Sequence, residues 1–560
     1  LLNPVVDGHW QLADNLTKII GRHTIKAGVE YIHWFVNRHV PSRAGLYGDF
    51  SYSNRFTGQP YGDFLLGVPT TTGRIDPWAA QYFRWNDTSF YIQDDFKLSA
   101  RLSLNYGVRY EYNQPAVARD DNFFTFNTTT GAVIVPTAAS KQLISPYYPA
   151  SLPVQTADQV GLGRSLRNTD KNNWAPRAGF SARLDDNGKT ILRGGAGLYY
   201  GHYSVGALSN QVEGPFAVST TSNNAFVNDK PLFTLAAPFA VPGATGTLNS
   251  AGMTPDLLNT YALQYSLTLE QELTRELGLR ISYIGTKGTQ LPYMRNFNQP
   301  LPSSQAFAQA RRPFPIYNNV TFVDNGANNS YHGLQAGVTK RFSRGLQFNS
   351  TLVWAKQLSE VDDTNNAEVN TQIENAYDRA RDKARVYSVP RLQWMNQALY
   401  DLPFGKGVLL GGWQLNVLIN VSTGHWLNPQ FTGSDPSNTN TVGGRPDVLN
   451  TVDYPKTVSA WFDRLDFAVP TGGRFGNAGR NIIEGPGYTV FNAGLNKRIM
   501  LPRENEIQIG ASFQNLFNHV NLGQPNMTVN VGTGGTITST HIFLPAGSPR
   551  QGQLTVRWKF

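Results

Sequence analysis

The glycine-rich segment 472–480 is the stretch of the chain that most resembles a ligand-binding loop. It reads Gly-Gly-Arg-Phe-Gly-Asn-Ala-Gly-Arg, and the backbone N–H groups of glycine-rich loops can hold phosphate groups. The segment lacks the Gly-Lys-Ser/Thr ending of a phosphate loop, and no helical pattern follows it. A flexible link that leads into a strand from Tyr488 is the better interpretation, so we predict no cofactor-binding residues.

Metal binding and nucleophilic catalysis have weaker signals still. Four carboxylates could bind calcium, namely Glu360, Asp362, Asp363 and Glu368. Their spacing fits no calcium loop and predicts a solvated acidic link. The nine histidines are dispersed, and we expect His33, on an aromatic strand, to be an interfacial or lumen residue. No nucleophile-elbow pattern accompanies the Ser, His and Asp residues. We therefore predict no catalytic and no metal-binding residues, and a protein that is not an enzyme.

The composition is that of a protein that needs polarity without many ions. Charged residues make up 16% of the 560 residues and glycine contributes 53, whereas a typical soluble domain has ~25% charged residues. The net charge of +9 comes from scattered Lys and Arg, so we predict no nucleic-acid partner. The sequence has no cysteine, no apolar run long enough for a transmembrane helix and no recognisable signal peptide.

Apolar and polar residues alternate with period two along much of the chain. The clearest such segments are residues 102–112, 261–270, 413–422 and 507–514. They run for about ten residues, which is long enough to cross a bilayer when the strand is tilted. The last segment, 553–560, ends its apolar face with Trp558 and Phe560. That ending is typical of the lipid-facing side of an outer-membrane β-barrel strand.

Short turns and long polar links alternate between these strands. We expect turns at residues 21–22, 99–101, 185–189, 274–275, 343–345, 403–411 and 501–505. We expect long links at residues 39–85, 115–173, 203–258, 286–329, 357–390, 425–486 and 517–550. Outer-membrane barrels sort their connections in this way, with short periplasmic turns and long extracellular loops. The sequence therefore predicts an all-β, antiparallel transmembrane β-barrel.

The number of strands predicts that this barrel is incomplete. The map holds about 15 strands, or about 17 if the 39–85 link contains another hairpin, whereas a bacterial single-chain barrel has an even number. We therefore expect residues 1–560 to be one N-terminally truncated barrel domain whose first strands are absent.

Two features of the long links could contact a ligand. Residues 367–385 are the one plausible helix and are expected to form a polar extracellular lid or ligand-contact element. The aromatic residues Tyr147, Tyr148 and Phe314 could stack on sugars or peptides, although packing of the links against one another is favoured. No individual substrate-binding residue is predicted.

Several motifs resemble those of TonB-dependent outer-membrane receptors of the Oar-like kind. Residues 513–521, Phe-Gln-Asn-Leu-Phe-Asn-His-Val-Asn, are similar to the Asn-Leu-Phe-Asn signature near the end of these receptors. Other similar segments are residues 63–67, 91–96, 106–111, 476–481 and 485–487. The resemblance covers most of the chain. It implies a barrel of roughly 22 strands with an N-terminal plug, located in the bacterial outer membrane.

The resemblance also implies function and partners. We expect active import of a bulky nutrient, such as a siderophore, an oligosaccharide or a peptide, with TonB acting through a plug that this chain lacks. Further expected partners are outer-membrane lipid, an extracellular ligand and, through Phe560, the barrel-assembly machinery. The alternatives are a passive porin and a surface adhesion or binding protein. A hydrolase with carboxylates and His at the barrel rim is a minor fourth possibility.

Overall fold

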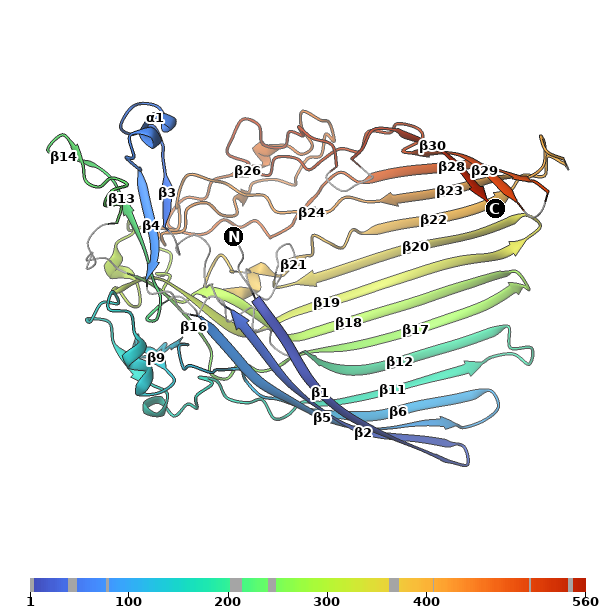
Figure 1. The fold of residues 1–560 in the computed structure, drawn as a ribbon, viewed down its shortest axis with the longest axis horizontal. Coiled ribbons are helices and arrows are strands. Elements are labelled where there is room, and N and C mark those ends of the chain that lie inside the picture. Colours follow the sequence, from blue (N-terminus) through green and yellow to red (C-terminus); the bar gives the residue numbers. More distant parts are fainter. Residues whose placement is uncertain are drawn as a thin grey trace.

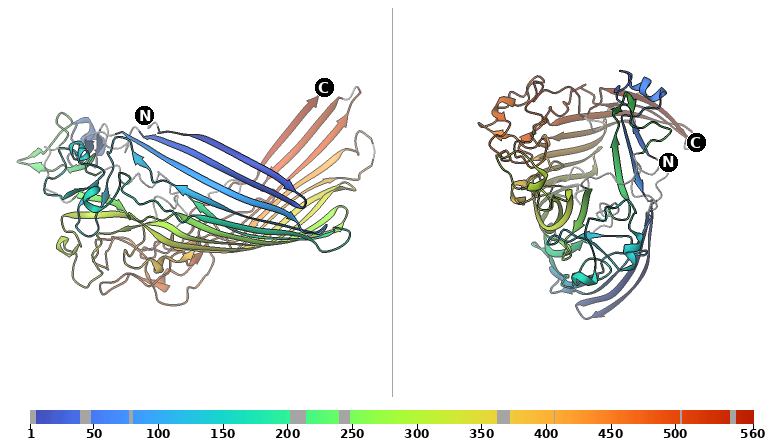
Figure 2. Two further views of the ribbon diagram at one scale, coloured as in Figure 1. Left: turned by 90° about the horizontal axis from the view of Figure 1, so that it is seen from below. Right: turned by 90° about the vertical axis from the view of Figure 1, so that its left-hand side faces the viewer.

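The dominant element of the protein is an 18-stranded sheet that curves into a long trough (Figures 1 and 2). The computed structural model describes residues 5–38, 48–76, 80–201, 214–239, 248–361, 372–405, 407–502, 505–541 and 547–560. Three members of the sheet are short side strands: β7 (Val117–Ala118), β16 (Leu248–Met253) and β21 (Ala384–Arg385).

The other fifteen strands form one continuous antiparallel series. In order they are β1 (Val5–Ile20), β2 (His23–Arg38), β5 (Gln81–Lys97), β6 (Leu102–Asn113), β11 (Trp174–Arg183), β12 (Thr190–Gly201), β17 (Thr260–Thr274), β18 (Leu277–Asn296), β19 (Tyr317–Ser343), β20 (Leu346–Ser359), β22 (Leu392–Asp401), β23 (Trp413–Ser422), β28 (Tyr488–Met500), β29 (Glu506–Gln514) and β30 (Gln551–Lys559). Each pairs with the next, from β1 on β2 to β29 on β30. The predicted count of 15 is confirmed.

The larger count of 17 is wrong, because β2 pairs directly with β5 and the described residues of the 39–85 link add no hairpin to the barrel. Its strands β3 (Asp49–Ser51) and β4 (Thr71–Asp76) join β13 (Val218–Asn223) in a separate three-stranded sheet. At three and six residues they are too short to cross a bilayer. The barrel wall passes directly from β2 to β5.

Short turns lie at one end of the trough and long links at the other (Figure 1). At the β19–β20 turn, Arg344 and Gly345 have φ angles of 51° and 77°, the left-handed conformation that a two-residue hairpin needs at both central positions. The 286–329 link is shorter than predicted, because β18 continues to Asn296 and β19 begins at Tyr317. Their extensions hold buried residues such as Tyr293 and Phe322.

The strands separate an apolar outer face from a polar inner face. Along β17, Leu263, Leu267 and Leu269 are exposed on the outer face. The residues between them, including Gln264 and Ser266, line a hollow on the concave face. This arrangement inverts that of a soluble protein, and it suits a wall between lipid and a water-filled lumen.

The hydrophobic core lies in the links. Fully buried aromatic residues come from the links and the strand ends beside them: Phe83, Phe123, Phe124, Phe126, Phe216, Tyr317 and Phe462. Short elements support these clusters: β8 (Thr125–Phe126), β9 (Val133–Val135), β10 (Val154–Thr156), β14 (Phe226–Val227), β15 (Lys230–Pro231), β24 (Trp426–Leu427), β25 (Asp447–Val448), β26 (Phe467–Ala468) and β27 (Ile483–Glu484). The links are therefore packed against one another.

The prediction of a helix at 367–385 is wrong for residues 372–385, the part of this segment that the structure describes. Residues 362–371 lie outside the described part of the chain, and residues 372–385 hold only a 3-10 turn, Arg379–Asp382, and β21. Charged side chains of this segment bind other links, so the segment follows those contacts in place of its helical propensity.

A short helix that sequence reasoning missed, α1 (Pro60–Leu65), lies in the 39–85 link. The buried carboxylate of Asp63 accepts hydrogen bonds from the backbone N–H groups of Phe56 (3.2 Å) and Thr57 (2.7 Å). Within the described residues, no helix is long and apolar enough to span a membrane, a finding that does not bear on strands.

Candidate functional site

The inner wall of β1, β2, β5 and β6 carries a chain of charged and polar side chains. Arg109 Nη2 lies 2.6 Å from Glu30 Oε2 and 2.5 Å from Ser89 Oγ, and its Nε lies 3.1 Å from Glu111 Oε1. Gln11 Nε2 donates to the other oxygen of Glu30 at 2.6 Å. Polar side chains are thus linked across four strands, with Arg109 paired to the two carboxylates.

Next to this network the inner wall is hollowed, because glycines take the place of side chains. The hollow has a volume of about 960 Å³. Its floor includes Gly107, Gly179, Gly195 and Gly197, and the Arg177 guanidinium lies over the Tyr199 ring at 4.3 Å. The guanidinium and the aromatic ring offer charge, hydrogen bonds and a stacking surface to a molecule in the lumen.

The wall of β20 to β29 has a second hollow, and carboxamides line it in place of ions. Its hollow has a volume of about 560 Å³ and is lined in part by Gln347, Asn349, Gln397, Asn416, Asn492, Asn496 and Gln514. Each carboxamide both donates and accepts hydrogen bonds without carrying charge. The two halves of the inner wall therefore offer different partners to a solute.

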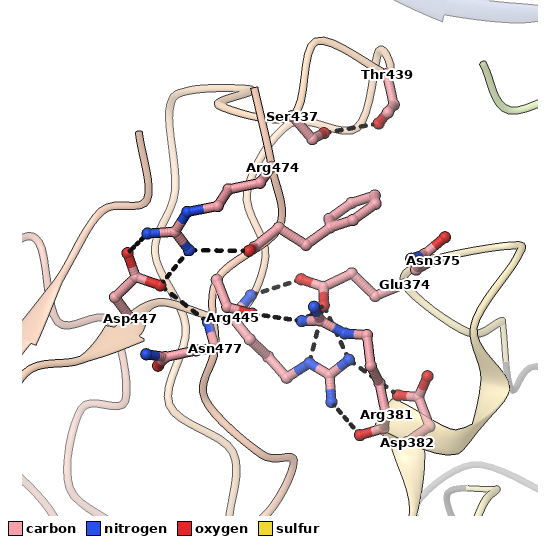
Figure 3. A network of polar contacts seen from close by, with 12 residues as sticks. Glu374, Asn375, Arg381, Asp382, Ser437, Thr439, Arg445, Asp447, Arg474 and Asn477 are labelled. Atoms are coloured by element: carbon pink, nitrogen blue, oxygen red, sulfur yellow. Dashed lines mark hydrogen bonds and ion pairs between the residues drawn. The ribbon is translucent and has the colours of Figure 1, made fainter. Parts of the chain in front are cut away.

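In the outer links a buried ionic network joins segments far apart in sequence (Figure 3). The Arg445 side chain is 5% exposed, and its Nη2 lies 2.9 Å from Glu374 Oε2 and 3.4 Å from Asp382 Oδ1. Its backbone N–H donates to Glu374 Oε1 at 2.7 Å. Burial raises the pKa of Asp382, although Arg445 and Arg480 act to lower it. This network holds the 357–390 link against the 425–486 link.

Two further arginines complete this junction. Arg381 Nη2 donates to Glu374 Oε2 at 3.0 Å and to the Gly476 carbonyl at 2.6 Å. Arg480 donates to the carbonyls of Asp382 (3.1 Å) and Ser359 (2.8 Å). These arginines donate hydrogen bonds to backbone carbonyls of the links, so these buried acceptors are paired.

The glycine-rich segment 472–480 belongs to the same junction and is not a phosphate loop. Arg474 makes a bidentate ion pair with Asp447, with both N–O distances 2.7 Å, and the Asn477 N–H donates to Asp447 Oδ1 at 2.9 Å (Figure 3). A Cβ at Gly476 would collide with the backbone of Pro446. The glycines thus permit close approach of two backbones.

The Asp447–Arg474 pair predicts a pH dependence of the links. Hydrogen bonding from Arg474 holds the pKa of Asp447 below its ordinary value of 3.8, so the carboxylate stabilises the links above that value. This stabilisation is lost as the pH falls through the lower pKa of the folded state. We expect amide hydrogen exchange in residues 447–480 to be faster in Asp447→Asn than in wild type at pH 7, and the difference to shrink below pH 3.8. A difference of constant size at every pH would contradict this.

Other residues considered as ligands have structural partners. His33 Nδ1 lies 2.7 Å from Asn86 Oδ1. Glu360 pairs with Arg379 at 3.0 Å, whereas Asp362, Asp363 and Glu368 lie outside the described residues. In the part of the chain that the structure describes, no three His, Cys, Asp or Glu side chains form a group that could hold a metal ion.

The aromatic residues of the long links pack the links against one another, which is the interpretation that the sequence favoured. Phe314 contacts the rings of Phe126 and Phe297, with centroids 5.5 and 6.3 Å apart. Tyr148 packs against two buried clusters of the links. Arg74 lies 5.6 Å from the centroid of the Tyr147 ring. Sequence reasoning did not find the ionic junction, because its members come from separate links with no common motif.

Comparison with known proteins agrees with this geometry. Residues 3–553 match the family model described as an outer membrane beta barrel domain, and no curated protein matches the sequence. The outer membrane transporter YddB from Escherichia coli is similar in structure, with a TM-score of 0.50, 13% identity, and coverage of 99% of this chain and 54% of that chain.

Two receptors are also similar, with lower scores. The ferripyoverdine receptor of Pseudomonas aeruginosa has a TM-score of 0.45 and 9% identity, covering 99% of this chain and 48% of that chain. The siderophore receptor PiuA from Acinetobacter baumannii has a TM-score of 0.45 and 10% identity, covering 99% and 56%. The chain spans about half the length of these structures.

A large antiparallel sheet with an apolar outer face, a polar inner wall and long links at one end defines a membrane β-barrel. The chain belongs to the outer membrane β-barrel domain family. The predicted fold class and the predicted location in the bacterial outer membrane are confirmed. The resemblance to outer-membrane receptors and transporters is confirmed as a likeness of fold.

Proposed function

We propose that the chain forms the barrel of an active importer for a bulky nutrient of the siderophore, oligosaccharide or peptide class. The observation that carries the proposal is the packed assembly of outer links beside a polar inner wall. Buried aromatic residues and the Arg445 network give these links a defined shape, which suits selective capture better than an open mouth does. The hollows of about 960 and 560 Å³ offer further polar contacts along the path.

Energy coupling in this proposal comes from TonB acting on a plug. The plug and the segment that meets TonB would belong to a part of the protein beyond residues 1–560. The exposed apolar face of β30 includes Trp558, and the exposed Phe560 follows the strand. The barrel-assembly machinery would recognise this end of the chain. No catalytic residue and no cofactor enter the proposal.

The experiment combines conductance and uptake, using the complete protein. We expect purified protein in a planar bilayer to show no steady resting conductance, because the plug closes the lumen. A ligand found in a binding screen of siderophores, oligosaccharides and peptides should accumulate in cells with TonB and not in isogenic cells without it. Steady conductance together with TonB-independent uptake would overturn the proposal in favour of a porin.

An adhesion or binding protein is the second candidate, favoured by one observation. Helix α1 lies at the far end of the links (Figure 1). Large apolar side chains are exposed on it and on the residue after it, namely Tyr61, Phe64, Leu65 and Leu66. Such exposed patches often mark interaction sites. Ligand binding at the cell surface without any accumulation inside would select this candidate.

A further inference from the structure

The connection between β22 and β23, residues 402–412, differs from every other short turn of the barrel. Its sequence is Leu-Pro-Phe-Gly-Lys-Gly-Val-Leu-Leu-Gly-Gly, with Lys406 as the one charged residue. Large apolar side chains are exposed along it: Phe404, Val408, Leu409 (83%) and Leu410. The other turns have more charged residues for their length; the turn at 185–189, for example, contains Asp185, Asp186 and Lys189. A turn made for water would not expose four large apolar residues together.

This turn folds over a lysine on the outer face of the barrel. Lys497 pairs in register with Trp413 and Ile509, which lie in the lipid-facing rows of β23 and β29. Nevertheless Lys497 is only 6% exposed. Its Nζ donates to the carbonyls of Leu409 (3.0 Å) and Gly411 and lies 5.2 Å from the centroid of the Trp413 ring.

The same contacts fix the turn in place. The Leu409 carbonyl accepts from Lys497 Nζ and from the indole N–H of Trp413, the latter at 3.1 Å. The Gly411 N–H closes the tip by donating to the Gly407 carbonyl at 3.0 Å. An ammonium group on a lipid-facing row is costly unless it is paired, and here backbone carbonyls and an aromatic face surround it.

We propose that this turn is a membrane anchor, with Phe404, Val408, Leu409 and Leu410 in contact with lipid of the periplasmic leaflet and Lys497 holding the turn against the wall. Lipid is the partner that the surroundings indicate. The apolar tip is continuous with the lipid-facing rows through Trp413, it lies at the end of the short turns, and the cation beneath it is covered. By contrast, other described turns expose charged residues, such as Arg22, Asp186 and Arg344.

Single-cysteine labelling tests the proposal, because residues 1–560 contain no cysteine; any cysteine elsewhere in the complete protein is first changed to serine. An environment-sensitive nitrobenzoxadiazole label is placed at Leu409→Cys of the complete protein in phosphatidylethanolamine–phosphatidylglycerol liposomes. Matched labels go to Leu267→Cys on the lipid-facing wall and Asn187→Cys in a polar turn. We expect doxyl-labelled lipid to quench the label at 409 as it does at 267, and aqueous iodide to quench the label at 187 far more. Iodide quenching at 409 equal to that at 187 would overturn the anchor, because the tip of the turn would then lie in water.

The role of Lys497 is tested in the same background. Lys497→Met removes the donor to the two carbonyls and should raise iodide quenching at position 409. Trp413→Phe keeps an aromatic ring but removes the indole N–H. It should raise iodide quenching at position 409 less, which keeps the test informative if the first variant does not fold. Unchanged quenching in both folded variants would overturn the holding role of Lys497.

Discussion

Leu267→Arg is expected to destabilise the barrel by about 2–4 kcal/mol, whereas Ser266→Arg at the neighbouring residue should be tolerated. Leu267 is the central residue of β17 and lies on the outer face, so an arginine there meets the middle of the bilayer. Ser266 lies on the inner wall opposite Gly195, where a long side chain has room in the 960 Å³ hollow.

The measurement is the free energy of unfolding in urea, for protein folded into liposomes, with both variants compared with wild type. A second comparison gives the depth dependence. An arginine at Leu273, near the short-turn end of the same strand and also exposed, should cost only about 0–1 kcal/mol. Equal losses for Leu267→Arg and Ser266→Arg would show that the two faces have been assigned wrongly.

Arg445→Leu is expected to loosen the outer links by about 3–5 kcal/mol of local stability, because it leaves the buried Asp382 carboxylate without its ion pair and Glu374 with Arg381 alone. Glu374 and Asp382 are 13% and 8% exposed, and both lie within 3.4 Å of Arg445 Nη2. Amide hydrogen exchange of residues 372–385 and 440–480 reports this loss, while exchange in the barrel strands should change little.

The matched control is an exposed pair in another link. Arg119 and Asp120 are paired at 2.8 Å, with side chains 55% and 43% exposed, so Arg119→Leu should cost less than about 1 kcal/mol. If Arg445→Leu exchanges like the control, the buried network does not hold the links together.

Period-two alternation was sufficient to predict the barrel wall. Strand identity follows from it, because one face must meet lipid and the other must be polar. The alternative counts of 15 and 17 follow from the sorting of short turns and long links. The alternation says nothing about the 372–385 segment, where Glu374 and Arg381 are drawn to partners in the 425–486 link. Contacts between links depend on three-dimensional proximity, which local pattern does not encode.

Some motifs have a physical role that only the structure shows. In the 513–521 signature, Asn515 takes a left-handed φ of 47°, and its side chain accepts from the His519 N–H and donates to the Ser548 carbonyl. Asn518 accepts from the Arg550 N–H at 2.9 Å. The signature therefore turns the chain out of β29 and fastens the start of the final link to its end, a structural task with no ligand chemistry.

The ionic junction of the links sets a constraint on the order of assembly. Arg480 donates to the carbonyl of Ser359 across 121 residues of sequence, whereas neighbouring strands such as β19 and β20 can pair as soon as their hairpin has formed. Contacts of such long sequence separation form slowly and late. The wall can therefore extend strand by strand while the junction stays open until the chain beyond β23 arrives. We therefore expect the outer links to take their final arrangement only after most of the wall has formed.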